Sequence, residues 1–367
     1  MRVVIAKKLL STVGGSEAQA RALGSALRDR GHDVTLAGLR PANRRAGIPD
    51  RVYDAPPGDV TLEDHGLTYR FIAGRLSLLQ GALPISLISA ERLAPAVAGA
   101  DVVHCLAREW AGPYERAARA AGAAFIETPL VHPGQPFSGD GVADIARYAR
   151  DDAVIGLTEW EADWYRAHGV DRAFTTGVGP ILDLSALPGR EPEPATILFV
   201  GRKERYKGYD ALRGAAGLVW RERPEARFVV IGQRRFLGPA PLPDPRWSEP
   251  GVVSEARKAE AYARATIFAM PSDHETFGHT YLEAWSACRP VIAGDIAPLR
   301  EVVREGIDGL HAANDPRAIA DAILALLDDP ARAKAMGAAG YRRVEERFTW
   351  PAIAAKTEAV YRGARLA

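Results

Sequence analysis

The sequence predicts an α/β protein of two Rossmann-like, doubly wound lobes that face a central cleft. Short apolar segments alternate with helical stretches, which indicates parallel sheets covered on both faces. This alternation stops at a proline-rich segment, residues 187–194, and then restarts. The length of 367 residues favours two domains, each long enough for its own core. We therefore expect domains at residues 1–186 and 187–345, followed by a C-terminal segment at 346–367.

The first lobe is expected to alternate strands with helices. A loop after the first strand leads into a helix at residues 16–30, with Ser16 as its N-cap and Gly31 after its end. Residues 41–83 carry no clear pattern and are predicted to be irregular. The strands are expected at residues 2–6, 34–37, 101–105, 124–127, 153–157 and 173–176.

The second lobe repeats this alternation after the linker at 187–194. A proline-rich excursion at residues 239–250 interrupts it, and helices are expected from residue 294 to the end. The other expected elements are strands at residues 196–200, 227–231, 266–270 and 290–293 and helices at residues 209–221 and 255–264.

Composition and charge exclude several classes of protein. The balance of 47 basic and 46 acidic residues gives a net charge of +1, which does not favour a nucleic-acid partner. Cys105 and Cys288 lie far apart and are predicted to be small buried residues, without a disulfide or zinc, in the reducing cytoplasm. The chain enters a strand at once, so no signal peptide is expected, and no apolar run reaches the ~18 residues of a membrane span. Peripheral membrane contact stays open.

The most informative segment runs from Pro271 to Ala284. An apolar strand leads into a Pro-Ser turn, a polar loop that holds Glu275, and a helix that begins near Phe277 and carries Glu283. A helix start offers free amide groups to an anion, and carboxylates suit sugar hydroxyls. A nucleotide sugar would satisfy both kinds of group. On spacing alone, two solvated carboxylates would be the simpler explanation, but the pattern Pro-Ser-x-x-Glu-x-Phe-Gly after an apolar strand favours a site.

A basic loop at residues 201–208 follows the first strand of the second lobe. Arg202 and Lys207 can converge there on one anion. Two cations that face a diphosphate form charge-assisted hydrogen bonds worth about 1.5–3 kcal/mol each. The alternative is a basic surface loop without a ligand. We expect Lys203 and Arg205 to be solvated in either case.

Gly14 and Gly15 join the first strand to the first helix. Two glycines allow a backbone to approach a ligand closely, and the helix start favours an anion. A dinucleotide-binding fingerprint needs a third glycine, but Ala18 stands at that position, so a dehydrogenase is disfavoured. Without a ligand the segment would be only a tight loop.

Three histidines and one valine complete the candidates. His132 follows a strand, at a position that faces the cleft in a fold of this kind, and we predict that it is functional. His104, at another strand end, and His32, in a turn before a strand, are predicted to be structural. Val252 comes after Gly251 and is a candidate for packing near a nucleobase.

The segment that starts at Pro271 and continues through Glu283 to Val303 resembles the signature of retaining GT-B glycosyltransferases of family 4, the glycosyl transferases group 1. The resemblance implies that Glu275 and His132 lie by the transferred sugar as catalytic residues. It also implies that Glu283 binds the ribose hydroxyls. The other donor-binding residues implied by the resemblance are Gly14, Gly15, Arg202, Lys207, Phe277, Gly278, His279 and Thr280.

The resemblance implies a GT-B fold whose C-terminal helix crosses back to the first lobe. It also implies transfer of a sugar from a nucleoside-diphosphate sugar to an acceptor hydroxyl with retention of the anomeric configuration. No cofactor and no metal would be needed, because cations and amides stabilise the leaving diphosphate. The acceptor, bound by the first lobe, could be a sugar, a lipid or a natural product.

Three alternatives remain at this point. The chain could be a GT-B sugar phosphorylase or a sugar-nucleotide epimerase. It could also be a catalytically silent partner that binds a nucleotide sugar. Two departures from the family pattern favour the silent partner: Cys288 replaces the usual glycine, and Leu130 stands near the position where the family often has a second histidine.

Overall fold

The structure, a computed structural model, describes residues 1–11, 15–45, 47–74, 88–135, 138–182, 184, 191–235 and 238–365. It divides into two compact units. Unit 1 contains Met1–Ile181 together with Trp350–Ala367, and unit 2 contains Leu182–Thr349. Each unit is built on a mainly parallel sheet, which confirms the predicted fold class. Residues 187–190, half of the expected linker at residues 187–194, lie outside the described residues.

The described strands of unit 1 form one sheet, and all neighbours in it pair in parallel except the first two in space. The strands, in their spatial order, are β3 (Val60–Asp64), β4 (Leu67–Ile72), β2 (Asp33–Leu39), β1 (Arg2–Ala6), β5 (Val102–Leu106), β6 (Ala124–Thr128), β7 (Ala153–Gly156) and β8 (Ala173–Thr175).

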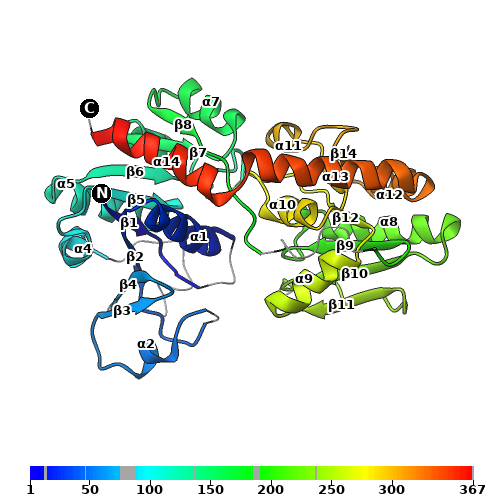
Figure 1. Cartoon of the computed structure of the whole chain (residues 1–367), viewed down its shortest axis with the longest axis horizontal. Coiled ribbons are helices and arrows are strands. Elements are labelled where there is room, and N and C mark those ends of the chain that lie inside the picture. Colours follow the sequence, from blue (N-terminus) through cyan, green and yellow to red (C-terminus); the bar gives the residue numbers. More distant parts are fainter. Residues whose placement is uncertain are drawn as a thin grey trace. The chain divides into compact units, whose positions relative to one another are not determined.

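Helices cover both faces of this sheet. The last helix of the chain packs against the first helix and against β6, so the C-terminal segment belongs to unit 1 (Figure 1). The helices are α1 (Gly15–Asp29), α2 (Asp50–Asp54), α4 (Ala90–Val97), the 3₁₀ turn η1 (Arg108–Trp110), α5 (Ala111–Ala120), α6 (Val142–Tyr148), α7 (Glu159–Ala167) and α14 (Trp350–Arg365).

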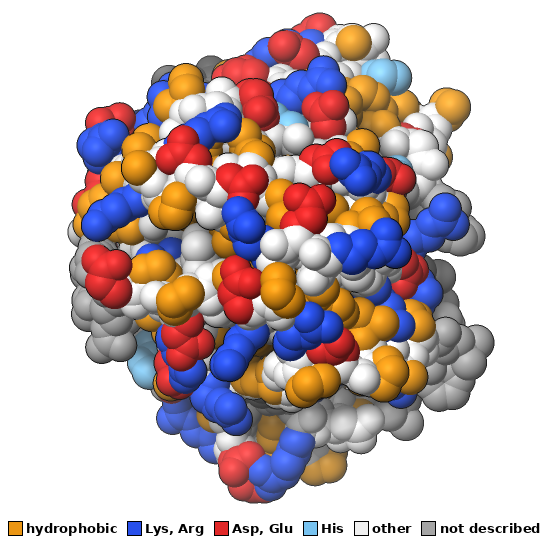
Figure 2. All heavy atoms as spheres, turned by 90° about the vertical axis from the view of Figure 1, so that its right-hand side faces the viewer, with side chains coloured by type: hydrophobic (Ala, Val, Ile, Leu, Met, Phe, Trp, Pro, Cys, Tyr) orange, Lys and Arg blue, Asp and Glu red, His pale blue; other side chains and the backbone are white. Residues whose placement is uncertain are grey.

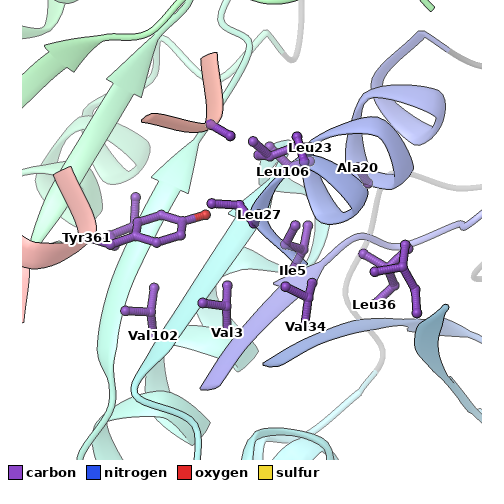
Figure 3. Packing of buried hydrophobic residues seen from close by; sticks show 14 of the residues in the cluster. Val3, Ile5, Ala20, Leu23, Leu27, Val34, Leu36, Val102, Leu106 and Tyr361 are labelled. Atoms are coloured by element: carbon purple, nitrogen blue, oxygen red, sulfur yellow. The ribbon is translucent and has the colours of Figure 1, made fainter. Parts of the chain in front are cut away.

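Two apolar clusters hold these layers together. On one face, Leu23 and Leu27 of α1 and Tyr361 of α14 pack over alternate residues of β1, β2 and β5 (Figure 3). On the other face, Val4 of β1 and Phe125 of β6 pack against α4 and α5. Both faces of the sheet are therefore buried, as the near-continuous apolar strands predict.

Unit 2 has its own parallel sheet, and helices lie between successive strands except between β10 and β11, where the described residues form none. The strands, in their spatial order, are β11 (Trp247–Gly251), β10 (Arg227–Ile231), β9 (Thr196–Val200), β12 (Ile267–Met270), β13 (Val291–Gly294) and β14 (Gly309–Ala312). The helices are η2 (Arg205–Lys207), α8 (Tyr209–Glu222), α9 (Glu255–Arg264), α10 (His279–Ser286), α11 (Ala297–Val302), α12 (Pro316–Asp328) and α13 (Pro330–Arg347).

The region predicted to be irregular, residues 41–83, is partly ordered, and that expectation was wrong. It holds α2 and the antiparallel hairpin of β3 and β4. His65 and Gly66 both have positive φ, 49° and 71°, between the paired residues Asp64 and Leu67. Two residues with positive φ fit the two-residue turn that suits a hairpin. Val60 and Leu62 of β3 are half-buried and alternate with exposed polar residues, and this alternation is the weak signal that the sequence analysis missed.

Smaller corrections concern the ends of elements. Helix α1 begins at Gly15, so Ser16 lies inside its first turn and is not the N-cap. Helix α10 begins at His279, two residues later than expected. β14 interrupts the expected run of C-terminal helices. β11 lies in the proline-rich excursion, where Pro250 is tolerated because the strand is at the sheet edge and pairs only with β10.

The surface shows no dominance of one charge. Acidic and basic side chains alternate over the face seen in Figure 2, with hydrophobic side chains scattered between them. This matches the net charge of +1. No helix in the described part of the chain combines the length and the apolar character needed to cross a bilayer.

Candidate functional site

The strand order of unit 2 brings two predicted loops together. From β9 the chain moves to β10 on one side, whereas β12 lies on the other side. Ligands of doubly wound sheets bind outside the carboxyl ends of the strands at such a switch point. The loop after β9 carries Arg202 and Lys207, and the loop after β12 carries Glu275. The fold therefore places these three residues at the same edge of the sheet.

Side-chain contacts connect these two loops. The ammonium group of Lys207 donates to the carboxylate of Glu275, and both side chains are largely buried. Arg202 donates to the hydroxyl of Tyr206. The Tyr206 ring also contacts both cations, with its centroid 5.7 Å from Arg202 Cζ and 5.3 Å from Lys207 Nζ. Tyr206, which the sequence analysis did not single out, is thus the residue that holds the two cations together.

The backbones of these loops touch as well. Asp273 N donates to Tyr206 O at 2.8 Å. Gly208 has φ of 82°, and a Cβ atom there would lie 2.7 Å from the carbonyl oxygen of Pro271. Only glycine fits such a close approach. The position of Lys207 next to Gly208 is therefore fixed by the backbone as well as by its ion pair.

The start of α10 lies at the end of the same loop. Gly278 precedes the helix with φ of 87°, and no side chain caps the helix. The amides at this helix start, the group predicted to face a diphosphate, have no side-chain cap that would compete with a ligand. The Phe277 side chain points elsewhere, because it is buried and packs edge-on against Phe348. His279 is half-buried, and the Thr280 hydroxyl lies 3.6 Å from Met270 Sδ.

Glu283 is a buried residue of α10 and not a solvated one. Its side chain accepts a hydrogen bond of 2.7 Å from the Tyr262 hydroxyl of α9, and the residue is 2% exposed. Burial raises the pKa of Glu283, while the positive charge of Lys258 opposes the shift. One oxygen of Glu283 therefore already has a protein partner. The predicted role in ribose binding is not tested by these contacts and stays a prediction.

Lys203 contradicts the expectation that it is solvated. Its ammonium group lies 2.7 Å from Glu249 Oε2, and the two side chains are 3% and 2% exposed. Burial works to raise the pKa of Glu249, but hydrogen bonds from three neighbouring side chains outweigh it and lower that pKa. The other donors are Tyr209 and Trp247. Lys203 anchors the loop internally, while Arg205 is exposed as expected.

Val252 and Cys288 each stand at a turn of unit 2. Val252 is 65% exposed after Gly251, which has φ of 79°. Its exposure leaves it able to contact a ligand, and the predicted role near a base stays untested. Cys288 has φ of 57°, the left-handed conformation that glycine adopts easily. The tight turn is thus formed despite the replacement of glycine, and Cys288 O lies too close to Gly337 for any Cβ atom there.

The candidates of unit 1 lie apart from those of unit 2 in the chain. Gly14 lies outside the described residues, and Gly15 is the first residue of α1. His132 is half-buried in the loop after β6, and its role stays a prediction. His104 is in the core, where its ring bonds to the Tyr361 hydroxyl and Thr128 Oγ1 at 2.7 and 2.8 Å. This confirms that His104 is structural.

A buried carboxylate that sequence reasoning missed holds the loop of His132. Glu161 accepts from the backbone N–H groups of Val131 and Leu157, at 3.3 and 2.8 Å, and from the Tyr165 hydroxyl at 3.0 Å. Burial raises the pKa of Glu161 to about 7. Thr158, three residues before Glu161, is the N-cap of α7. The Thr-x-x-Glu pattern typical of a capping box was therefore the available sequence signal.

His32 is buried, as a structural residue should be. Its ring lies 3.3 Å from the N-terminal amine and 3.5 Å from Glu358. Among the described residues, no group of three or more His, Cys, Asp or Glu side chains could hold a metal ion. The expectation that no metal is needed stays a prediction.

Two family models match the chain, one for each unit. The model described as "Glycosyl transferase 4-like domain" matches residues 14–179, and the model described as "Glycosyl transferases group 1" matches residues 194–329. Both descriptions agree with the resemblance found in the segment around Glu275 and Glu283.

Curated relatives are similar to part of the chain. The D-inositol 3-phosphate glycosyltransferase of Kineococcus radiotolerans is 35% identical over 253 residues, which cover 58% of this chain and 57% of that protein. The alpha-maltose-1-phosphate synthase of Mycolicibacterium smegmatis is 31% identical over 260 residues, which cover 61% of this chain and 63% of that protein. The chain thus matches less than two thirds of the length of either relative.

Solved structures resemble the whole chain. Sucrose-phosphate synthase from Thermosynechococcus elongatus has a TM-score of 0.72 at 21% identity, and the alignment covers 99% of this chain and 98% of that one. HepE from Anabaena, solved in complex with UDP and glucose, has a TM-score of 0.75 at 13% identity and 98% coverage of both chains. At these identities the likeness shows the fold, which is GT-B.

Proposed function

We propose that this chain, a GT-B glycosyltransferase of family 4, transfers a sugar from a nucleoside-diphosphate sugar to a hydroxyl group of an acceptor. One observation supports this most strongly. Arg202, Lys207 and Glu275 gather at the switch point of unit 2, where a doubly wound sheet binds its ligand. Two cations and a carboxylate suit a ligand that has both phosphate and hydroxyl groups.

The cations would act mainly on the leaving group. Negative charge develops on the diphosphate as the bond to the sugar breaks, and preorganised donors stabilise that charge. Arg202 and Lys207 are already held by Tyr206, so little reorganisation is needed at the moment of reaction. The uncapped amides at the start of α10 would add to this stabilisation. We propose that these groups suffice without a metal ion.

Lys207 would change partners when the donor binds. In this structure it pairs with Glu275, and a phosphate oxygen would compete for the same ammonium group. Release of Glu275 from the pair would leave its carboxylate able to accept a hydrogen bond from a sugar hydroxyl. This exchange connects donor binding to the catalytic role proposed for Glu275.

We further propose that the anomeric configuration is retained. The support is the resemblance of the segment from Pro271 to Val303 to retaining enzymes. In that scheme a phosphate oxygen of the leaving diphosphate takes the proton of the acceptor hydroxyl, on the face of the sugar that the diphosphate leaves. NMR of the first product formed would decide this, because the coupling of the anomeric proton differs between retention and inversion.

The test of the donor assignment is a binding panel. Nucleoside-diphosphate sugars, beginning with UDP-glucose, are titrated calorimetrically into the wild type and the Glu283→Ala variant. Loss of the ribose hydrogen bonds should weaken binding by about 30- to 1000-fold, or roughly 2–4 kcal/mol. Glu260→Ala removes an exposed carboxylate from α9 and serves as the matched control.

Tyr262→Phe separates binding from support of the fold. It removes the hydrogen bond to Glu283 but keeps the carboxylate. If Glu283 contacts the ribose, Tyr262→Phe should retain most of the donor affinity that Glu283→Ala loses. Absence of binding by every donor, or binding that is indifferent to Glu283, would contradict the proposal.

A further inference from the structure

Asn314 joins two loops of the candidate site, although it belongs to neither of them. It lies two residues after β14, an edge strand of the unit 2 sheet. Its side-chain amide donates to Arg205 O in the loop after β9 and to Asp273 Oδ2 in the loop after β12, both at 3.0 Å. The amide nitrogen carries two hydrogens, so one of them serves each loop. We call this pair of hydrogen bonds the brace.

Asp273 is the residue through which the brace reaches the second loop. Its backbone N–H donates to Tyr206 O at 2.8 Å, and its other carboxylate oxygen bonds to His274 Nδ1 at 2.6 Å. The rings of Tyr206 and His274 meet edge to face, with centroids 6.4 Å apart. These contacts connect residues 201–208, the cation loop, to residues 271–278, the carboxylate loop, next to the residues assigned to the donor.

The brace differs from the ion pair that joins the same two loops. Lys207 pairs with Glu275 in the free protein, and the proposed binding of a diphosphate ends this pair. A phosphate group competes for a charged ammonium group far better than for a neutral amide whose two hydrogens are already bonded. The amide of Asn314 therefore keeps its two partners when Lys207 changes its own.

The relative position of the two loops matters for the reaction. The cation loop holds Arg202 and Lys207, which are assigned to the diphosphate, and the carboxylate loop holds Glu275, which is assigned to the sugar. A displacement of about 1 Å at a reacting centre can lower the rate by about 100-fold. A connection that survives donor binding therefore has a function in catalysis as well as in stability.

We propose that Asn314 and Asp273 are positioning residues for the transfer reaction. They keep the carboxylate of Glu275 aligned with the phosphate-binding cations after Lys207 has exchanged Glu275 for a phosphate oxygen. Neither residue touches the donor in this scheme, because both act through the loops that they join. The inference rests on the proposed function, since it states how the same site keeps its geometry when the donor binds.

Calorimetry with UMP, UDP and UDP-glucose tests the brace. UMP has one phosphate, UDP adds the second, and UDP-glucose adds the sugar assigned to Glu275, so the need for aligned loops rises along this series. Asn314→Ala should weaken binding of UMP by less than about twofold, of UDP by about threefold and of UDP-glucose by about tenfold or more. If the panel selects another donor, that donor and its own mono- and diphosphate replace the three ligands.

Two variants of Asp273 show whether the hydrogen bond itself is responsible. Asp273→Ala should reproduce the graded losses of Asn314→Ala. Asp273→Asn keeps an oxygen that can accept from Asn314 Nδ2, so it should retain most of the affinity for UDP-glucose. The double variant Asp273→Ala/Asn314→Ala should lose no more than the weaker-binding single variant, because both residues belong to one connection.

Asp329→Ala is the matched control for a merely structural role. Asp329 is the N-cap of α13 and accepts from Arg332 N at 2.9 Å. Its loss should lower Tm, because a helix loses its cap, but should leave the three affinities unchanged well below Tm. Equal weakening of all three ligands by Asn314→Ala, or a lower Tm without weakening, would overturn the inference.

Failure of the proposed function gives a different result. If the wild type binds no nucleotide of the panel, the proposed function is wrong, and hydrogen exchange measured by mass spectrometry then decides the inference. Asn314→Ala should speed exchange in both the cation loop and the carboxylate loop, whereas Asp329→Ala should speed it in neither. Unchanged exchange in both loops of the Asn314→Ala variant would show that the brace does not hold them.

Discussion

The two switch points, between β9 and β12 in unit 2 and between β1 and β5 in unit 1, each contain a lysine–glutamate pair, but the two pairs differ in the distance between their charges and in their exposure to solvent. In unit 2, Lys203 and Glu249 are nearly inaccessible, and Glu249 also accepts from Tyr209 and Trp247. In unit 1, Lys7 lies 3.6 Å from Glu109, whose side chain is 32% exposed. Trp110 Nε1 and Tyr114 OH, both in the apolar cluster with Phe125, are buried without a hydrogen-bond partner in the described structure.

The difference distinguishes buried charges that stabilise the fold from buried charges that are available to bind a ligand. A buried charge whose partners are all within the protein fixes the loop that carries it, because a broken pair leaves an uncompensated charge. A buried charge with incomplete partners destabilises the free protein and is compensated when a ligand arrives. Unit 2 uses Lys203 for the first purpose, whereas Lys207 is paired with Glu275 and would exchange that partner for a phosphate when the donor binds.

The largest expected effect comes from Lys203→Met. The substitution leaves Glu249 buried without its cation, so the free energy of unfolding should fall by about 3–5 kcal/mol. Lys7→Met should cost about 1 kcal/mol or less, because Glu109 can reach solvent. Urea unfolding of both variants measures the comparison. Equal losses of unfolding free energy would show that the two ion pairs contribute equally to stability and would contradict this comparison.

Donor binding gives the next contrast. Lys207→Met should weaken UDP binding by about 10- to 100-fold, since one charge-assisted contact to the diphosphate is lost. Lys7→Met should leave UDP binding unchanged, because the diphosphate is assigned to Arg202, Lys207 and the amides of α10. Calorimetry on both variants, with UMP as a ligand that lacks the second phosphate, checks the assignment. A similar loss in Lys7→Met would contradict it.

A buried acid of unit 1 offers a pH-dependent test. Burial, reinforced by the negative charge of Glu127, raises the pKa of Asp151 to about 10. The folded protein therefore keeps the proton while the unfolded chain loses it. The stability contributed by this group is complete below the unfolded pKa and is lost as the pH rises from there through about 10.

Asp151→Asn keeps the shape and removes this titration. It should raise the free energy of unfolding by about 2 kcal/mol at neutral pH and flatten its decline between about pH 5 and about pH 9. Asp171→Asn, on the loop before β8, is the control for an unburied acid of the same unit. A variant with an unchanged slope would exclude Asp151 as a protonated buried acid.

The smallest effect is expected at the turn of Cys288. A Cβ atom on a residue in the left-handed conformation costs about 1–2 kcal/mol, and Cys288→Gly removes this cost. The glycine also gives the unfolded chain more conformational freedom, which offsets part of the gain. The net gain should be about 0.5–1 kcal/mol, seen as a small rise in Tm. Cys288→Ala retains the Cβ atom and should show no gain. A lower Tm for the glycine variant would mean that the thiol makes a contact worth more than the strain.

Much of the fold follows from sequence because its strands are short apolar runs between loops. β1, β9 and β10 begin and end where the pattern predicts. The hairpin of β3 and β4 was missed because its polar face is exposed and its turn residue, His65, carries no hairpin signature. β11 was missed because Pro250 argues against a strand, and only its edge position permits it.

The candidate site follows from sequence only where one segment carries it. Spacing and local pattern place Glu275 and Glu283 on a loop and a helix, and the structure agrees. The partner of Lys203 could not be predicted, because Glu249 lies on the strand that was missed. Tyr262 lies on α9 and Glu283 on α10, and no local pattern encodes the hydrogen bond between them.

Helix α14 is made after unit 2 but completes the first unit. The ribosome makes residues 182–349 before α14. Until then His104 lacks its hydrogen bond to Tyr361, and α1 lacks the helix that packs against it. At about 5–20 residues per second, synthesis of residues 182–349 takes on the order of 10–30 s. During this interval unit 2 can fold on the nascent chain, whereas the earlier unit waits with an apolar face exposed. A truncation just after residue 349 would therefore damage the beginning of the protein more than the part next to the cut.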